Sequence, residues 1–193
     1  MTEKDMLAVR GHAIEEEYFR KKDRELIERM RRAAASSEAR AKMGEETGLT
    51  DPGMLQELET LGFTPDTVVL LPLVPVVEMA WAEGGVTPAE RQLIIKLART
   101  RGIDEGGVAD RQLSHWLDHR PGEQVFRHAA RLIRAMLAAP GHEDLTVDDL
   151  VTHCESVADA SGGILGLGII GRVSPDERRL LATIAAELKG RAS

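Results

Sequence analysis

The sequence is poor in cysteine and in aromatic residues. It has a single cysteine, Cys154, and aromatic residues make up 3% of its 193 positions. One cysteine excludes an internal disulfide and fits a reducing compartment. A core with so few rings must be packed by Leu, Ile, Val, Ala and Met, which suits helices better than a sandwich of strands.

The sequence also has no excess of basic residues over acidic ones. The 25 Lys and Arg residues are outnumbered by 32 Asp and Glu, which gives a formal net charge of -7. Unaided binding of nucleic acid needs a basic surface that neutralises phosphates, so nucleic acid is not expected as a partner.

Targeting and membrane-spanning segments are absent as well. The start of the chain is densely charged and does not resemble a secretory signal. The longest apolar stretch, residues 67–82, contains Pro72, Pro75 and Glu78 and is too short to cross a bilayer comfortably. We therefore expect a soluble, cytoplasmic protein without direct membrane insertion.

Residues 1–47 differ from the rest because their acids and bases balance. Acids precede bases at helical spacing, as in Glu16 with Arg20, which favours a long exposed helix at about 0.2–0.5 kcal/mol per pair. A sparse apolar stripe on this helix could dock on the protein's own body, bind a partner protein or form a homo-oligomer. The stripe consists of Leu7, Ile14, Tyr18, Phe19, Leu26, Ile27 and Met30.

Two domains are expected from this change in composition. The small and polar residues at 33–50 predict a linker. We therefore expect a charged helix with its linker over residues 1–47 and a helical domain over residues 48–193.

The stretch from Val76 to Gly102 predicts two helices joined by a glycine turn. Thr87 can cap the free N–H groups of the second helix, Pro88 suits its first position, and Glu90 can bond back to the cap. The same opening recurs later, where residues 171–181 match residues 84–94 position by position.

The remaining pattern predicts helices throughout. Pro72 and Pro75 each remove a backbone hydrogen bond, so the apolar helix should kink or break near residues 71–75. No stretch alternates in the manner of a strand, which makes the expected fold class all-α. The expected helices cover residues 52–61, 64–83, 88–101, 108–119, 121–138, 146–160 and 175–189.

The turn motif resembles the tellurite-resistance TerB-like family. The resemblance is carried by an apolar helix, then Trp81-Ala82-Glu83-Gly84, then Val86-Thr87-Pro88-Ala89-Glu90-Arg91, and it covers about residues 60–190. The stretch from Val157 to Glu177 resembles the C-terminal half of such proteins. The family usually has Asp where this chain has Glu83.

The resemblance implies an all-α helical bundle with an internal pseudo-twofold repeat, preceded here by an additional long N-terminal helix. It also implies a non-enzymatic sensor, adaptor or scaffold role linked to tellurite and chemical stress. Some members of the family have an acidic patch that is reported to bind divalent cations.

Three acids around the glycine turn are candidate metal ligands: Glu78, Glu83 and Glu90. If the tight turn brings them together, their oxygens suit Ca²⁺ or Mg²⁺. Alternatively, Glu90 only completes the helix cap and Glu83 is solvated. The second copy is the weaker candidate because Leu165 and Ile170 replace Glu78 and Glu83.

Two histidines are the candidates for a transition-metal site. His115 and His119 lie four residues apart on an expected helix, and His128 lies on the next. The catalytic form of this spacing needs Glu after the first histidine, but Trp116 follows here. A surface pair around a buried Trp116 is therefore favoured.

Two further patterns have simpler explanations. Gly166–Gly171 matches the glycine fingerprint of dinucleotide-binding turns, but no strand precedes it, so a tight helix crossover is favoured. Cys154 follows His153, but neighbouring residues on a helix point apart, which argues against a nucleophile–base pair.

No residue set forms a catalytic signature, so the chain is not expected to be an enzyme. The favoured function is a non-catalytic binding or adaptor module with a protein partner, and with a divalent cation as a further ligand, in a stress response. One alternative is an assembly protein that oligomerises through its N-terminal helix. The other is a metal-dependent hydrolase built on His115 and His119.

Overall fold

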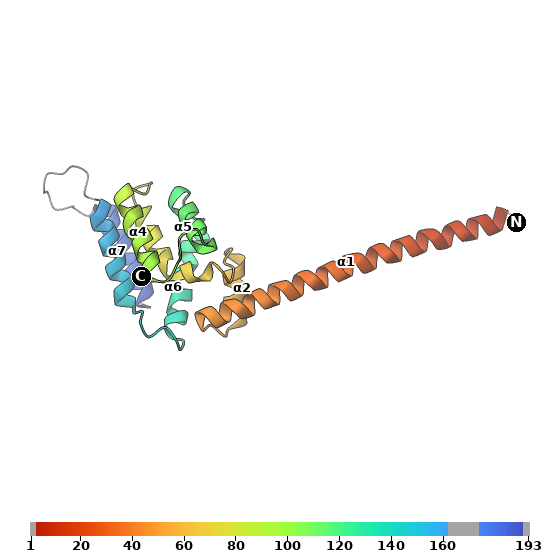
Figure 1. Ribbon diagram of the computed structural model, residues 1–193, viewed down its shortest axis with the longest axis horizontal. Helices are drawn as coiled ribbons and strands as arrows, with labels where there is room; N and C mark the ends of the chain where they lie inside the picture. Colours follow the sequence, from red (N-terminus) through yellow and green to blue (C-terminus); the bar gives the residue numbers. More distant parts are fainter. Residues whose placement is uncertain (1–2, 162–173, 191–193) are drawn as a thin grey trace. The chain divides into compact units, whose positions relative to one another are not determined.

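The computed structural model describes residues 3–161 and 174–190, with side chains described for residues 22, 26–160 and 174–190. These residues form eight α-helices and one 3₁₀ helix, and no strand occurs among them (Figure 1). The predicted all-α class is therefore confirmed. The chain divides into two compact units, residues 1–39 and 40–193.

The first helix, α1, covers Glu3–Thr47 and is longer than the sequence predicts. The expected linker over residues 33–50 is wrong up to Thr47, because this segment is helical. Its alanines and long polar side chains have high helix propensity. Although α1 is 45 residues long, neither it nor any other helix of the described residues is apolar enough to cross a membrane.

The last turns of α1 belong to the second unit and are fixed in its core. Met43 is fully buried. The hydroxyl of Thr47 donates to the carbonyl of Met43 over 2.6 Å and accepts from the N–H of Leu49 over 3.3 Å. Gly48 then ends the helix with a φ of +67°, a left-handed conformation that favours glycine.

The apolar segment that follows is broken at its prolines, as predicted. Helix α2 covers Pro52–Thr60, and its cap Asp51 accepts from the N–H of Met54 over 2.8 Å. The 3₁₀ helix η1 covers Val68–Leu73, and α3 covers Val74–Ala80. Pro72 lies inside η1 and Pro75 at the start of α3, where a missing N–H costs little.

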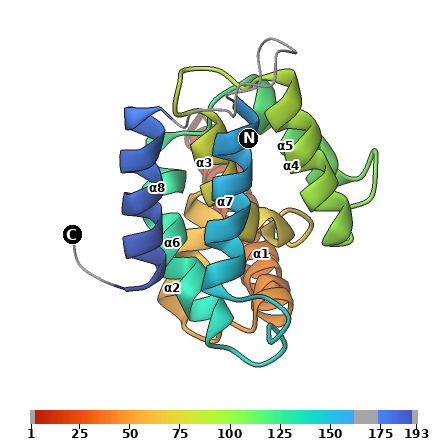
Figure 2. The ribbon, with the colours of Figure 1, turned by 90° about the vertical axis from the view of Figure 1, so that its left-hand side faces the viewer.

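Helix α3 is the centre of the second unit. It packs against α4, α6, α7 and α8, which surround it in Figure 2. Its apolar side chains are almost completely buried, as the sequence predicts for this segment. The surrounding helices are α4 Pro88–Thr100, α5 Val108–Asp118, α6 Glu123–Leu137, α7 Val147–Ser161 and α8 Pro175–Leu188.

Capping boxes begin both α4 and α8, as the duplicated opening predicts. Thr87 donates its N–H to the Glu90 carboxylate over 2.7 Å, and its hydroxyl accepts from the N–H of Glu90 over 3.3 Å. Ser174 and Glu177 make the same two bonds over 2.6 and 3.2 Å. Both predicted capping boxes are thus confirmed, whereas the internal pseudo-twofold repeat stays a prediction. Residues 171–173 of the aligned segment lie outside the described residues.

Substitution of Gly48 tests the anchoring of α1. A Cβ at Gly48 would lie 2.7 Å from the Cβ of Ala139, in addition to the strain of a positive φ. We expect Gly48→Ala to lower the free energy of unfolding by about 2–4 kcal/mol, measured by denaturant titration.

Gly62→Ala is the matched control. Gly62 also has a positive φ, of +89°, but a Cβ there would meet nothing within 4 Å. Gly62→Ala should lower the free energy of unfolding only by the backbone strain, which is about 1–2 kcal/mol. Equal costs for the two variants would contradict the close packing of the α1 end against Ala139.

Candidate functional site

Glu90, the first of the predicted metal ligands, is buried and is used by the start of α4. Its side chain accepts the N–H of Thr87 within the capping box, and only 2% of the residue is exposed. Burial raises the pKa of Glu90, and the two hydrogen bonds with Thr87 partly oppose this effect. The carboxylate therefore stabilises the helix end, and this role requires no metal.

Glu78 and Glu83 lie in different environments. Glu83 is exposed in the turn after α3. Glu78 is half-buried on α3, and burial together with the nearby charges of Glu187 and Glu123 raises its pKa to about 7. Glu78 therefore faces acids of α8 and α6, which are not the residues predicted to share its site.

These positions do not assemble into a metal site. Among the residues whose side chains the structure describes (22, 26–160 and 174–190), no group of three or more His, Cys, Asp or Glu is arranged to hold a metal ion. Glu83 does lie close enough to Glu90 to raise its pKa. Two carboxylates, one of them already bonded to the backbone, are fewer than the six to eight oxygens that Ca²⁺ takes.

The histidine pair lies on the surface, as the sequence favours. His115 and His119 are both exposed, and their rings stack with centroids 4.7 Å apart. Trp116 between them is buried, and its carbonyl accepts from the indole N–H of Trp81 over 2.9 Å. His128 is engaged elsewhere, through hydrogen bonds with Glu57 and Gln124.

The two remaining sequence patterns are the glycine fingerprint and Cys154 beside His153. Gly166–Gly171 lies outside the described residues. Cys154 is fully buried, and burial raises the pKa of its thiol to about 12. The thiol is therefore protonated at neutral pH, which disfavours a role as a nucleophile.

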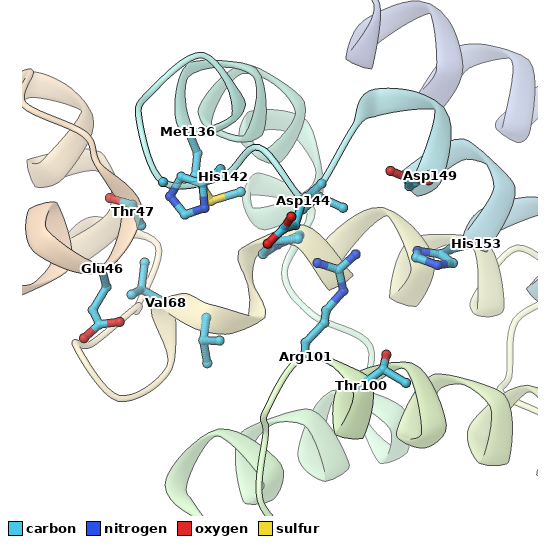
Figure 3. A pocket seen from close by; sticks show the side chains of 14 residues that line it. Glu46, Thr47, Val68, Thr100, Arg101, Met136, His142, Asp144, Asp149 and His153 are labelled. Carbon is cyan, nitrogen blue, oxygen red and sulfur yellow. The ribbon is translucent and has the colours of Figure 1, made fainter.

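The structure contains a cavity that the sequence does not predict. Its volume is about 510 Å³, and its walls come from the end of α1, η1, the end of α4, the end of α6, the following loop and α7 (Figure 3). All of these segments belong to the second unit. The polar residues in its walls are Glu46, Thr47, Thr100, Arg101, His142, Asp144, Asp149 and His153.

Two side chains in this cavity have buried nitrogen atoms without a hydrogen-bond partner. They are Arg101 Nε and His153 Nδ1. Figure 3 shows the Arg101 side chain extending from the end of α4 into the space next to His153 on α7. Burial lowers the pKa of both groups, and their mutual repulsion lowers that of His153 further, while Asp149 opposes the change.

The acids of the cavity are not equivalent. Asp149 accepts from both the N–H and the hydroxyl of Thr146, over 2.9 and 2.6 Å, and so caps α7. These bonds lower the pKa of Asp149. Neither Asp144 nor Glu46 forms a side-chain hydrogen bond or ion pair with the described part of the chain. These two carboxylates remain available to a ligand.

The cavity residues lack a sequence signal because they are far apart along the chain. Arg101 follows the last residue of α4 and precedes the positive-φ Gly102, a position that suggests only a helix end. His153 is one polar residue on α7, about fifty positions later. Packing of α4 against α7 brings the two together.

A separate candidate surface lies on α1. Leu26, Ile27 and Met30 are exposed by 55%, 48% and 64%. Leu26 and Met30 are four residues apart and therefore share one side of the helix, with Ile27 three residues before Met30. These three side chains, called the α1 apolar patch below, belong to the apolar stripe identified in the sequence.

No family model, curated protein or solved structure matches the chain. The resemblance to the TerB-like family thus rests on sequence motifs alone and stays a prediction. An all-helical fold does not by itself determine function. Function is inferred below from the surface of α1 and from the cavity.

Replacing Glu78 tests its unusual environment. Its pKa is 4.5 ordinarily and about 7 in the folded protein. At pH values between these two, the Glu78 carboxyl group is deprotonated in the unfolded state but still protonated in the native state. The contribution of Glu78 to stability is therefore most favourable below the lower value and declines as pH rises through the higher one.

We expect Glu78→Gln to be neutral at low pH and to raise the free energy of unfolding by about 1–3 kcal/mol at mildly alkaline pH. Denaturant titrations across this pH range measure the effect. Glu83→Gln, which removes an exposed carboxylate, is the control and should show no such gain. A pH-independent effect of Glu78→Gln would be inconsistent with the burial of its charge.

Proposed function

We propose that the protein is a non-catalytic binding module that recruits a partner protein through the α1 apolar patch. The observation that carries this proposal is the exposure of three large apolar side chains within about one turn of a continuous helix. The second unit is a folded body with its own core, and the last turns of α1 belong to it.

The location of the patch supports partner binding. Among the described side chains, the other large exposed apolar residues are Val69 and Val108, which lie singly on the second unit. Scattered apolar residues are ordinary on a surface, whereas a group of them marks an interaction site. The gathering of Leu26, Ile27 and Met30 on α1 is therefore the more informative feature.

The chemistry of the patch favours an amphipathic helix as the partner. Apolar anchors at i, i+1 and i+4 fit between the side chains of a second helix. The exposed ion pair of Glu28 with Arg32, whose atoms lie 3.1 Å apart, lies on the opposite side of the helix and leaves the patch uncovered. A partner helix with an apolar face would complement this surface.

The stress-response context and the cation site of the sequence-based hypothesis rest on different observations. The stress-response context comes only from the resemblance to the TerB-like family and is retained as part of the proposal. Cation binding by Glu78, Glu83 and Glu90 has no assembled site among the described residues, so it forms no part of the proposal. A non-catalytic role is favoured because Cys154 is buried and protonated and the histidine pair lacks a third ligand.

The test is to introduce charge into the patch. We expect the full-length triple variant Leu26→Glu, Ile27→Glu, Met30→Glu to lose at least about 90% of a specific partner that wild type captures stoichiometrically, because each truncated anchor removes about 1–2 kcal/mol of binding. Quantitative affinity capture followed by mass spectrometry measures this loss. Val108→Glu, which also places a charge at an exposed apolar position, is the matched control and should retain the partner.

Self-association is separated from partner binding by light scattering on the purified proteins. A dimer of wild type that dissociates in the triple variant would assign the patch to homo-oligomerisation, which is the assembly alternative. Equal capture by wild type and the triple variant, with both monomeric, would contradict any binding role of the patch.

A further inference from the structure

The cavity between α4, α7 and the end of α1 has features that neither the packing of the fold nor the α1 apolar patch explains. Its volume of about 510 Å³ lies in the range of small-molecule binding sites, about 300–1,000 Å³. Its lining combines apolar residues such as Val68 and Met136 with several polar side chains. Such a mixture suits a small ligand that has both a carbon skeleton and polar ends.

Arg101 provides the strongest sign of a ligand. A guanidinium group stays charged in proteins, and a buried charge is normally paired with an acid or fully hydrogen-bonded. The side chain of Arg101 has neither kind of partner among the described residues, and its Nε is buried. Asp149 is close enough to raise the pKa of Arg101, but no hydrogen bond or ion pair joins the two residues, and Asp149 Oδ2 is bonded to Thr146.

His153 supplies a second polar group beside Arg101. Its buried Nδ1 has no partner. Because burial and the Arg101 charge both lower the pKa of His153, the ring is neutral at neutral pH. A neutral imidazole can donate or accept one hydrogen bond through this nitrogen, according to its tautomer.

The chemistry of these groups selects the ligand class. The planar fork of a guanidinium matches a carboxylate group in a bidentate arrangement. Asp144 and Glu46 line the same cavity and would repel an anion that carries several charges. They would, however, attract an ammonium group at the other end of a zwitterion.

We propose that this cavity binds a small amino carboxylate, whose carboxylate group is held by Arg101 with a hydrogen bond from or to His153, and whose ammonium group faces Asp144 and Glu46. The site goes beyond the proposed partner-binding function, since it uses none of the residues of the α1 apolar patch. It also gives a role to the half-buried Arg101, whose Nε is buried without a hydrogen-bond partner.

The experiment is isothermal titration calorimetry of the full-length protein with β-alanine, γ-aminobutyrate and L-lysine as probes. Butyrate and butylamine, which each have one of the two charged groups, and inorganic phosphate are the comparison ligands. We expect saturable binding of one amino carboxylate per chain, and binding about tenfold weaker or more for butyrate and butylamine, because each lacks one charged contact.

Arg101→Gln should abolish this binding, and Asp144→Asn should weaken it. Arg127→Gln is the matched control, because Arg127 is exposed on α6 and does not line the cavity. In the absence of ligand, Arg101→Gln should keep or raise the melting temperature, since it removes a half-buried charge that has no hydrogen-bond or ion-pair partner among the described residues. None of these substitutions should affect capture through the α1 apolar patch.

An independent measurement on wild type guards against a variant that does not fold. The arginine Nε–H resonances are followed by NMR during the same titration, and the Arg101 signal is expected to shift on binding. The proposal is overturned if no amino carboxylate produces heat or moves this signal. It is equally overturned if phosphate binds more tightly than every amino carboxylate, or if folded Arg101→Gln binds with wild-type affinity.

Discussion

Burial of the apolar segment that ends in α3 is the constraint on which the second unit depends. The segment is too apolar to face water, yet Pro72 and Pro75 prevent it from forming one long α-helix. The chain resolves this conflict by placing one proline in a 3₁₀ helix and the other at the start of α3. Helix α3 is then enclosed by α4, α6, α7 and α8. The positions of those helices follow from the need to cover its apolar side chains.

The buried polar groups fall into two classes with different consequences. Glu90 and Glu177 are each bonded to the backbone of a helix start, and they stabilise the fold without any external partner. Arg101 and His153 instead keep buried nitrogens without partners, and both line a cavity. A desolvated polar group without a hydrogen-bond partner is costly, and this cost is the reason why the ligand is proposed for this cavity.

The long helix α1 contains the α1 apolar patch, and its last turns belong to the second unit. Its end is fixed by Met43 and Thr47 in the core, whereas Leu26, Ile27 and Met30 expose their side chains to solvent. Glu46 and Thr47, near the end of the same helix, also line the cavity. Residues of one continuous helix therefore belong to both candidate sites, although the two sites share no residue.

The sequence by itself determined the features that depend on neighbours along the chain. The all-α class, the break at the prolines and both capping boxes were predictable because each rests on contacts within about four residues. The linker prediction was wrong up to Thr47 because the alanines and long polar side chains of this segment have high helix propensity, and the burial of Met43 adds to the stability of its last turns. Only the tertiary structure placed Glu78 beside acids of α6 and α8 and Arg101 beside His153. These relations depend on the packing of helices that are distant in sequence, and no local pattern encodes which side chains such packing leaves buried without partners.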